Sequence, residues 1–187
     1  MRKLAILAVA GILLTAPLHA QLPQDAYVGL YADGEHSQWC VNGAAVYEFD
    51  MWVWILPSER GVLCVEHGVQ FPSNVIEGAI VYNSAVVFVE TAAPSKYSMW
   101  YNECQLDWHW TLRQSLVVST DEPSFIEILP DPISGECQVG TCQDCSPAEL
   151  FVMYTALFIN FPPDDAVCRG TATSSSTWGA IKSLFSD

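Results

Sequence analysis

Hydrophobic and polar positions alternate along most of the chain after residue 26, as they do in β-strands that bury one face. The clearest example runs from Val46 to Leu56, where every odd position is apolar and the even positions include Glu48 and Asp50. A period of two over this length predicts a long strand with one face on a core. Residues 57–61, which include Pro57 and Gly61, predict a turn after it.

The same alternation predicts further short strands, separated by segments rich in Pro, Gly, Asn or Asp. Between residues 106 and 113 it places Leu106, Trp108, Trp110 and Leu112 on the buried side and His109 on the polar side. The predicted strands span residues 27–31, 46–56, 62–71, 79–82, 85–89, 106–113, 116–119 and 125–129.

The last third of the predicted domain is less regular. Residues 130–147 are rich in Pro, Gly and Cys and predict a loop, and Ser146 to Glu149 has the pattern of a helix start. Residues 151–161 are apolar on all sides and predict at most a helical turn followed by a strand buried on both faces. Short strands without alternating helices predict an all-β, antiparallel, immunoglobulin-like β-sandwich over residues 21–168.

The two ends of the chain differ from this domain in composition. Residues 1–20 combine Arg2 and Lys3 with an apolar run and a small residue, Ala20, which is typical of a cleaved export signal. The apolar run is too short for a membrane-spanning helix, so we expect a secreted, cell-surface or periplasmic protein with no span in the mature chain. Residues 169–177 predict a flexible linker. Trp178, Ile181, Leu184 and Phe185 then share one helical face, which suits a helix docked on the sandwich or a tag for export or surface attachment.

The chain is acidic and rich in apolar residues. Its 187 residues include 21 acids against 7 Lys and Arg, a net charge of −14, and 51% of them are hydrophobic. This composition excludes intrinsic disorder, and the shortage of cations argues against nucleic acid as a partner. Loss of the signal would remove two basic residues and no acid, leaving 5 basic residues and a net charge of −16. Such a surface repels anionic membranes.

Seven cysteines lie after the predicted signal. In an exported chain they predict disulfides, and three bridges would leave one cysteine over. A zinc site built on Cys142, Cys145 and Cys137 is the alternative, and a redox role for the CxxC at 142–145 is a further one. The candidates for bridges are Cys40, Cys64, Cys104, Cys137, Cys142, Cys145 and Cys168.

The segment from Val46 to Val89 resembles the opening of cohesin-like modules. It combines a strand, the turn at 57–61 and a second strand whose end reads Val69-Gln70-Phe71-Pro72-Ser73-Asn74-Val75, followed by further short strands. The chain is also similar to small exported bacterial β-sandwich proteins of unassigned function that carry a signal, one cysteine-bearing sandwich and a short Trp-containing tail. The resemblance implies a cohesin-like sandwich and carries over no functional residue.

Trp52 and Trp54 form the most informative pair for function. They share the face of the predicted strand opposite its apolar stripe, beside Glu48 and Asp50. Two exposed indoles form a flat surface on which a sugar ring can stack, and nearby carboxylates accept hydrogen bonds from hydroxyls. The alternative is that a loop or the C-terminal tail covers this face and buries both indoles.

The histidines offer a weaker case for chemistry. His67 shares parity with buried residues, so we expect a hydrogen-bonded core or rim histidine. Asp107 and His109 could orient a base or hold a metal, but no third partner is visible, which favours a solvated strand face. No hydrolase, dinucleotide or phosphate-loop motif occurs in the sequence.

Acidic turns raise the question of calcium. Asp131, residues 33–35 and residues 164–165 place carboxylates in turns, without the spacing of an EF-hand. An acidic surface accounts for them, so no metal site is predicted.

Together these patterns predict an exported, non-enzymatic β-sandwich that acts in adhesion or assembly at the cell exterior. We expect an extracellular protein or glycan ligand, with no cofactor and no catalytic residue. The alternatives are a carbohydrate-binding module using Trp52 and Trp54, and a small hydrolase using Asp107 and His109.

Overall fold

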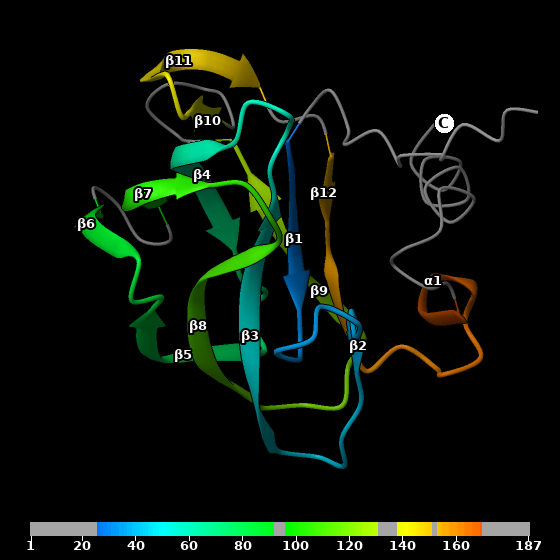
Figure 1. Cartoon of the computed structure of the whole chain (residues 1–187). Coiled ribbons are helices and arrows are strands. Elements are labelled where there is room, and N and C mark those ends of the chain that lie inside the picture. Colours follow the sequence, from blue (N-terminus) through cyan, green and yellow to red (C-terminus); the bar gives the residue numbers. More distant parts are fainter. Residues whose placement is uncertain (1–25, 92–95, 131–137, 151–152, 170–187) are drawn as a thin grey trace, which may run out of the picture.

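The computed structural model describes residues 26–91, 96–130, 138–150 and 153–169 (Figure 1). The predicted export signal and all but the first residue of the predicted linker and tail lie outside these ranges, as do Asp131 and Cys137. Within the described ranges, no helix has the length and apolar character that a membrane span requires.

The described part of the chain is built almost entirely from strands. The near absence of helix confirms the all-β prediction. The elements are β1 (Tyr27–Tyr31), β2 (Cys40–Val41), β3 (Tyr47–Leu56), β4 (Val62–Gln70), β5 (Val75–Tyr82), β6 (Val86–Glu90), β7 (Lys96–Gln105), β8 (His109–Val118), β9 (Ser124–Leu129), β10 (Gln138–Thr141), β11 (Asp144–Leu150), β12 (Met153–Thr155), β13 (Leu157–Ile159) and the helix α1 (Ala166–Arg169).

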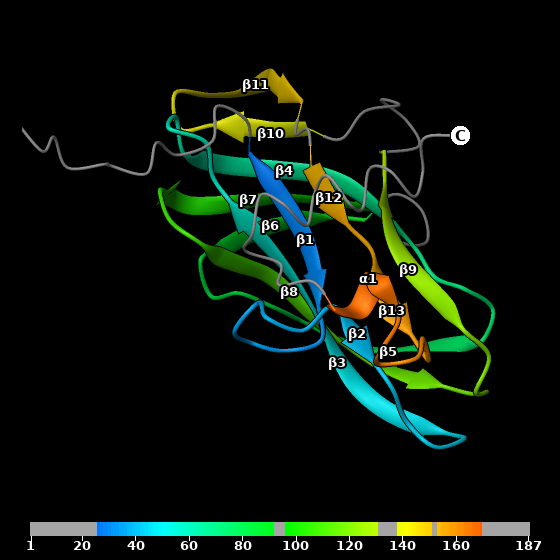
Figure 2. The ribbon, with the colours of Figure 1, turned by 90° about the vertical axis from the view of Figure 1, so that its right-hand side faces the viewer.

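The strands form two sheets that pack on each other, which confirms the predicted β-sandwich. The five-stranded sheet has the order β12-β1-β3-β8-β5. The second sheet has the order β11-β10-β4-β9-β13-β2 and also carries β7 beside β4 and β6 beside β7. Neighbouring strands are antiparallel except for β1 with β12 and β13 with β2, which are parallel. Figures 1 and 2 show β10 and β11 at one end of the sandwich and the β2–β3 connection at the other.

The core lies between the sheets and comes from the alternating apolar positions of their strands. On β3, Met51, Val53 and Ile55 are fully buried, as the parity of the sequence predicts. They join one hydrophobic cluster with residues of the opposite sheet, such as Met99 and Ile128. Each such side chain contributes about 1.5–3 kcal/mol by leaving water.

A β-bulge in β8 interrupts this alternation at Thr111. Val53 of β3 pairs with Leu112, but its neighbour Trp54 pairs with Trp110, so Thr111 is an extra residue in the ladder. The Thr111 hydroxyl donates a hydrogen bond to the Val53 carbonyl at 3.3 Å. An extra residue turns the side chains before it to the opposite face of the sheet. Trp110 therefore lies on the outer face, although the sequence predicted it in the core.

The bulge also corrects the predictions for the neighbouring residues. Trp108 packs with the aromatic side chains outside the sandwich core, whereas His109 contacts the ring of Tyr101, which belongs to the core. The expected solvated position of His109 was therefore wrong. Leu106, predicted to be buried, is 64% exposed and precedes the strand.

Four strands occupy segments where none was predicted, namely β2, β7, β10 and β11. β7 was missed altogether, although its alternate residues Tyr97, Met99 and Tyr101 are only 2%, 0% and 4% exposed. β10 and the start of β11 lie within the predicted loop at 130–147, and residues 146–149 continue β11 instead of starting a helix. Pairing with β4 overrides the weak local preference there, and Pro147 is tolerated because β11 is an edge strand. At 157–159 the strand buried on both faces is confirmed as β13.

Three disulfides confirm the predicted bridges. Cys40 pairs with Cys168, Cys64 with Cys145, and Cys104 with Cys142. The two cysteines of the CxxC segment therefore belong to different bridges, each to another strand, and are not available together for zinc or for redox exchange. The bridges link β2 to α1, β4 to β11, and β7 to the β10–β11 turn.

The turn that precedes β4 lies against one of these bridges. The Gly61 amide donates to the Ser58 carbonyl at 3.0 Å, and Gly61 has a φ of 69°, a value that favours glycine. A Cβ at this position would collide with the sulfurs of Cys142 and Cys104. The glycine of the predicted turn thus allows the bridge to form.

Candidate functional site

Each sheet presents an outer face that carries aromatic and acidic side chains. We call the outer side of β4, β6 and β7 the hollow face. We call the outer side of β1, β3 and β8 the indole face. These two surfaces contain the strongest candidates for binding among the described residues.

An apolar row crosses the hollow face. Strand pairing lines up Phe88 of β6, Trp100 of β7 and Cys64 of β4. The rings of Phe88 and Trp100 meet edge to face with centroids 5.0 Å apart, and Phe88 is 54% exposed. Trp100 is partly exposed, and an accessible aromatic pair on a strand surface is a typical contact for a partner molecule.

An acidic row lies next to the apolar one. Pairing lines up Glu90, Ser98 and Glu66 across the same three strands. The Ser98 hydroxyl donates to Glu66 at 2.9 Å, and the Lys96 ammonium lies 3.3 Å from the same carboxylate. Lys96 is 6% exposed, so this ion pair compensates part of the cost of burying its charge.

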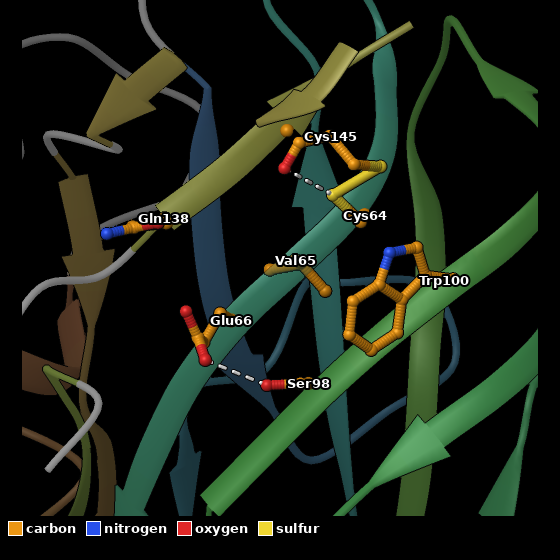
Figure 3. A pocket seen from close by; sticks show the side chains of 8 residues that line it. Cys64, Val65, Glu66, Ser98, Trp100, Gln138 and Cys145 are labelled. Atoms are coloured by element: carbon orange, nitrogen blue, oxygen red, sulfur yellow. Dashed lines mark hydrogen bonds between the residues drawn. A yellow bond between two sulfur atoms is a disulfide. The ribbon is translucent and has the colours of Figure 1, made fainter. Parts of the chain in front are cut away.

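Between these rows lies a hollow of about 70 Å³. Figure 3 shows the Cys64–Cys145 bridge at one side of it, the Trp100 ring at another, and the hydrogen-bonded Ser98 and Glu66 below. One wall of the hollow is therefore apolar, and another carries the Glu66 carboxylate, which Ser98 and Lys96 hold in place. The lining residues are Cys64, Val65, Glu66, Ser98, Trp100, Gln138, Gly140 and Cys145.

The indole face is arranged differently, because a loop covers part of it. Trp54 is only 8% exposed, since the His36 ring lies 4.7 Å from it, centroid to centroid. The same His36 ring stacks on Trp108 at 4.5 Å with an interplanar angle of 14°. Of the two indoles considered for sugar binding, only Trp52 therefore remains partly exposed. Trp54 is covered by a loop, which was the alternative considered from the sequence.

Local hydrogen bonds hold this covering loop in place. The Asp33 carboxylate accepts hydrogen bonds from the backbone amides of Ser37 and Gln38 at 2.9 and 3.2 Å. His36, which lies between Asp33 and Ser37 in the sequence, adopts a φ of 45°. Asp33 was one of the positions considered for calcium. Its carboxylate instead accepts hydrogen bonds from backbone amides of its own loop.

Two tyrosines of β1 complete the aromatic cluster beneath the loop. The hydroxyls of Tyr27 and Tyr31 are hydrogen-bonded at 3.0 Å, and both side chains are buried. Burial raises the pKa of Tyr31 far above its usual value, and the neighbouring Tyr27 raises it further. The Tyr31 hydroxyl therefore stays protonated at neutral pH.

Trp52 remains partly exposed at the edge of the cluster. It meets Trp110 edge to face at 5.2 Å, and the guanidinium of Arg113 lies over its ring at 5.5 Å. Asp50 lies 3.7 Å from Arg113, while Glu48 is exposed farther along β3. The structure thus brings Trp52, Asp50 and Glu48 onto one face, as predicted, and adds Trp110 and Arg113 to them.

His67 and His109 both face the interior. His67 is fully buried, with Nδ1 at 3.4 Å from the Gly68 carbonyl, and burial lowers its pKa to about 4. His109 contacts Asp107 through the backbone carbonyl, at 3.0 Å from Nδ1, and burial lowers its pKa as well. The Asp107 carboxylate instead accepts from the Trp108 amide at 3.0 Å. His67 is the core histidine that the sequence predicted.

The remaining acids considered for metal binding are not clustered. Asp165 accepts from the Val167 amide at 3.0 Å, and Asp164 lies 3.9 Å from Arg169. Across the described residues, no three His, Cys, Asp or Glu side chains come together as a metal site requires.

The chain is similar in fold to cohesin domains. The sixth cohesin from scaffoldin B of Acetivibrio cellulolyticus, solved in complex with a dockerin, has a TM-score of 0.51 at 11% identity, covering 74% of this chain and 99% of that one. A type II cohesin domain from the cellulosome of the same organism has a TM-score of 0.51 at 8% identity, covering 73% and 96%.

A type I cohesin–dockerin complex from Clostridium thermocellum gives the same result. Its TM-score is 0.51 at 9% identity, covering 74% of this chain and 94% of the other. No family model and no curated protein matches the sequence. With sequence identities this low, the structural similarity to cohesin domains establishes the fold alone. It confirms the cohesin-like resemblance that the sequence of residues 46–89 shows.

The residues that make the hollow face a candidate were not predicted from the sequence. Trp100 lies in β7, the strand that was not predicted, and Phe88 was assigned to a strand without a role. The alternation of Tyr97, Met99 and Tyr101 could have revealed β7 and, with it, the outward position of Trp100.

Proposed function

We propose that this protein is an exported, non-enzymatic β-sandwich that acts in adhesion or assembly at the cell exterior by binding another protein. The observation that carries the proposal is the contact of the exposed Phe88 with the partly exposed Trp100 beside the hollow on the outer face of β4, β6 and β7. Central aromatic side chains with polar neighbours are the usual anchors of protein interfaces.

The fold supports the same role. Two of the cohesin structures to which the chain is similar were solved in complex with dockerins, which are protein partners. Three disulfides cross-link the sandwich, so we expect it to hold such a partner with little change in its own backbone.

Export is supported by two independent features. The first 20 residues have the pattern of a cleaved signal, and three disulfides suit an oxidising compartment outside the cytoplasm. The proposed location is the medium, the cell surface or the periplasm, and the proposed ligand is an extracellular protein.

The experiment compares surface variants of the chain that begins at Gln21. The wild-type protein is immobilised and exposed to exported proteins from the source cells, and the Kd of each purified captured protein is then measured. We expect at least one captured protein to bind Phe88→Glu at least tenfold more weakly, because a charge would enter the centre of the contact.

Phe125→Glu is the matched control, since Phe125 is also exposed, at 42%, but lies on β9. It should bind with the wild-type Kd. Equal binding by all three proteins would contradict the proposed face, and the absence of any captured protein would contradict the proposed function.

A further inference from the structure

We infer that the exposed part of the indole face is a second binding site, and that its ligand is a neutral oligosaccharide. The site consists of Trp52, Trp110, Arg113, Asp50 and Ser115. It lies on the five-stranded sheet, on the opposite side of the sandwich from the hollow face, and it does not depend on the protein-binding role proposed above.

The β-bulge creates the aromatic part of this site. Because Thr111 is an extra residue, the Trp110 indole turns outward and meets Trp52 edge to face at 5.2 Å. The two rings form a corner, and both remain partly exposed. A regular strand would have pointed Trp110 into the core, where it could contact no ligand.

The polar part of the site is ordered before any ligand arrives. Arg113 lies over the Trp52 ring at 5.5 Å and 3.7 Å from one oxygen of Asp50. The Ser115 hydroxyl donates to the other oxygen of Asp50 at 2.9 Å. Arg113 and Asp50 are each 39% exposed, so their groups are held by neighbours and still accessible to a ligand.

This combination of groups fits the chemistry of a sugar. The C–H face of a pyranose stacks on an indole, while a carboxylate and a guanidinium form charge-assisted hydrogen bonds with neighbouring hydroxyls. A few fixed polar groups beside an apolar surface are the general pattern of small-ligand sites.

The length and charge of the site restrict the ligand further. Trp110, Arg113 and Ser115 occupy three successive rows of the outer face, so the site spans about 13 Å along β8 at about 6.6 Å per row. This length suits a short oligosaccharide better than a single sugar. Glu48 lies just beyond Asp50 and is exposed, and the whole chain carries a charge of −14, which disfavours anionic sugars.

The test is calorimetric titration of the chain from Gln21 onward with neutral hexasaccharides of glucose, mannose, galactose and N-acetylglucosamine. We expect at least one of them to bind, and we expect both Asp50→Asn and Arg113→Gln to weaken that binding at least tenfold. Both side chains are partly exposed, so these variants should fold. Trp110→Ala should abolish the binding.

Phe125→Ala, a change of an exposed aromatic residue on β9 of the other sheet, is the control and should bind with the wild-type affinity. Binding of none of the hexasaccharides would overturn the inference. So would a bound hexasaccharide whose affinity is unchanged in Asp50→Asn and Arg113→Gln. Neither result bears on the protein capture experiment, so the two proposals can fail separately.

Discussion

The hollow face and the indole face carry similar residue types but expose them differently. On the hollow face Phe88 is 54% exposed, and nothing among the described residues covers it. On the indole face Trp54 is 8% exposed, because His36 and Trp108 lie against it. The difference arises from a loop of a few residues between β1 and β2. An aromatic residue on the outer side of a strand is therefore available for binding only where no local segment folds back over it.

The largest effect should come from removing the bridge at the edge of the hollow. Cys64→Ala combined with Cys145→Ala opens a loop of 81 residues. If the bridge acts by restricting the unfolded chain, its removal should lower the free energy of unfolding by about 4 kcal/mol. Urea denaturation would measure this loss. Amide exchange should become faster in β10 and β11 and stay unchanged in β1 and β3. Faster exchange in β1 would mean that the two faces are not independent.

Acidification should produce the next largest effect, through His67 beneath the hollow face. Burial lowers the pKa of His67 to about 4 from the usual 6.5, so the unfolded chain binds a proton more readily than the folded one. The stability contributed by neutral His67 is complete above pH 6.5 and is lost as the pH falls toward 4. The loss amounts to about 3 kcal/mol.

His67→Leu isolates this effect, because leucine does not titrate. Urea denaturation at several pH values should give a difference between wild type and variant that grows by about 3 kcal/mol between pH 7 and pH 4. A constant difference across this range would show that His67 is not the group responsible.

Uncovering the indole face should have a smaller effect. His36→Asn removes the ring but keeps a residue that tolerates the positive φ of 45°. We expect a loss of about 1–2 kcal/mol from the contacts with Trp54 and Trp108, and a shift of tryptophan emission to longer wavelength as water reaches them. An emission spectrum equal to that of the wild type would show that another segment covers the cluster.

The smallest effect is expected at the hollow face itself. Phe88→Ala should change the free energy of unfolding by about 0.5 kcal/mol or less, because the side chain is more than half exposed. Thermal unfolding followed by circular dichroism measures this. A loss of 2 kcal/mol would indicate that Phe88 serves folding and would weaken its assignment as a contact for a partner.

The fold was largely predictable from the sequence, because the alternation along β3 and the absence of helix patterns determine a sandwich. The orientation of the site was not. Nothing in the sequence of β8 marks Thr111 as an extra residue, yet this bulge decides that Trp110 faces outward and His109 inward. Such a bulge depends on how β3 and β8 align, and this alignment is a property of the pair of strands.

The cysteines show the same limit. An exported chain with seven cysteines predicts bridges, but the pairing of Cys64 with Cys145 depends on β10 and β11 folding beside β4. Those two strands lie in a segment whose Pro, Gly and Cys content predicts a loop. Likewise, the burial of Trp54 depends on the loop that carries His36, and strand periodicity alone contains no information about such a cover.

The Cys40–Cys168 bridge determines how the protein would respond to mechanical tension. It joins two residues that are 128 positions apart, so every strand after β2 lies inside a covalently closed loop. A pulling force applied at residues 26 and 169 passes through the two sulfurs, and residues 41–167 cannot be extended while the bond is intact. Only the segment up to residue 39, which contains β1, can be drawn out, to a full length of about 50 Å at 3.3–3.6 Å per residue. Under such a load the hollow face, whose strands all lie inside this loop, would stay folded, whereas the indole face would lose β1 and the segment that carries His36.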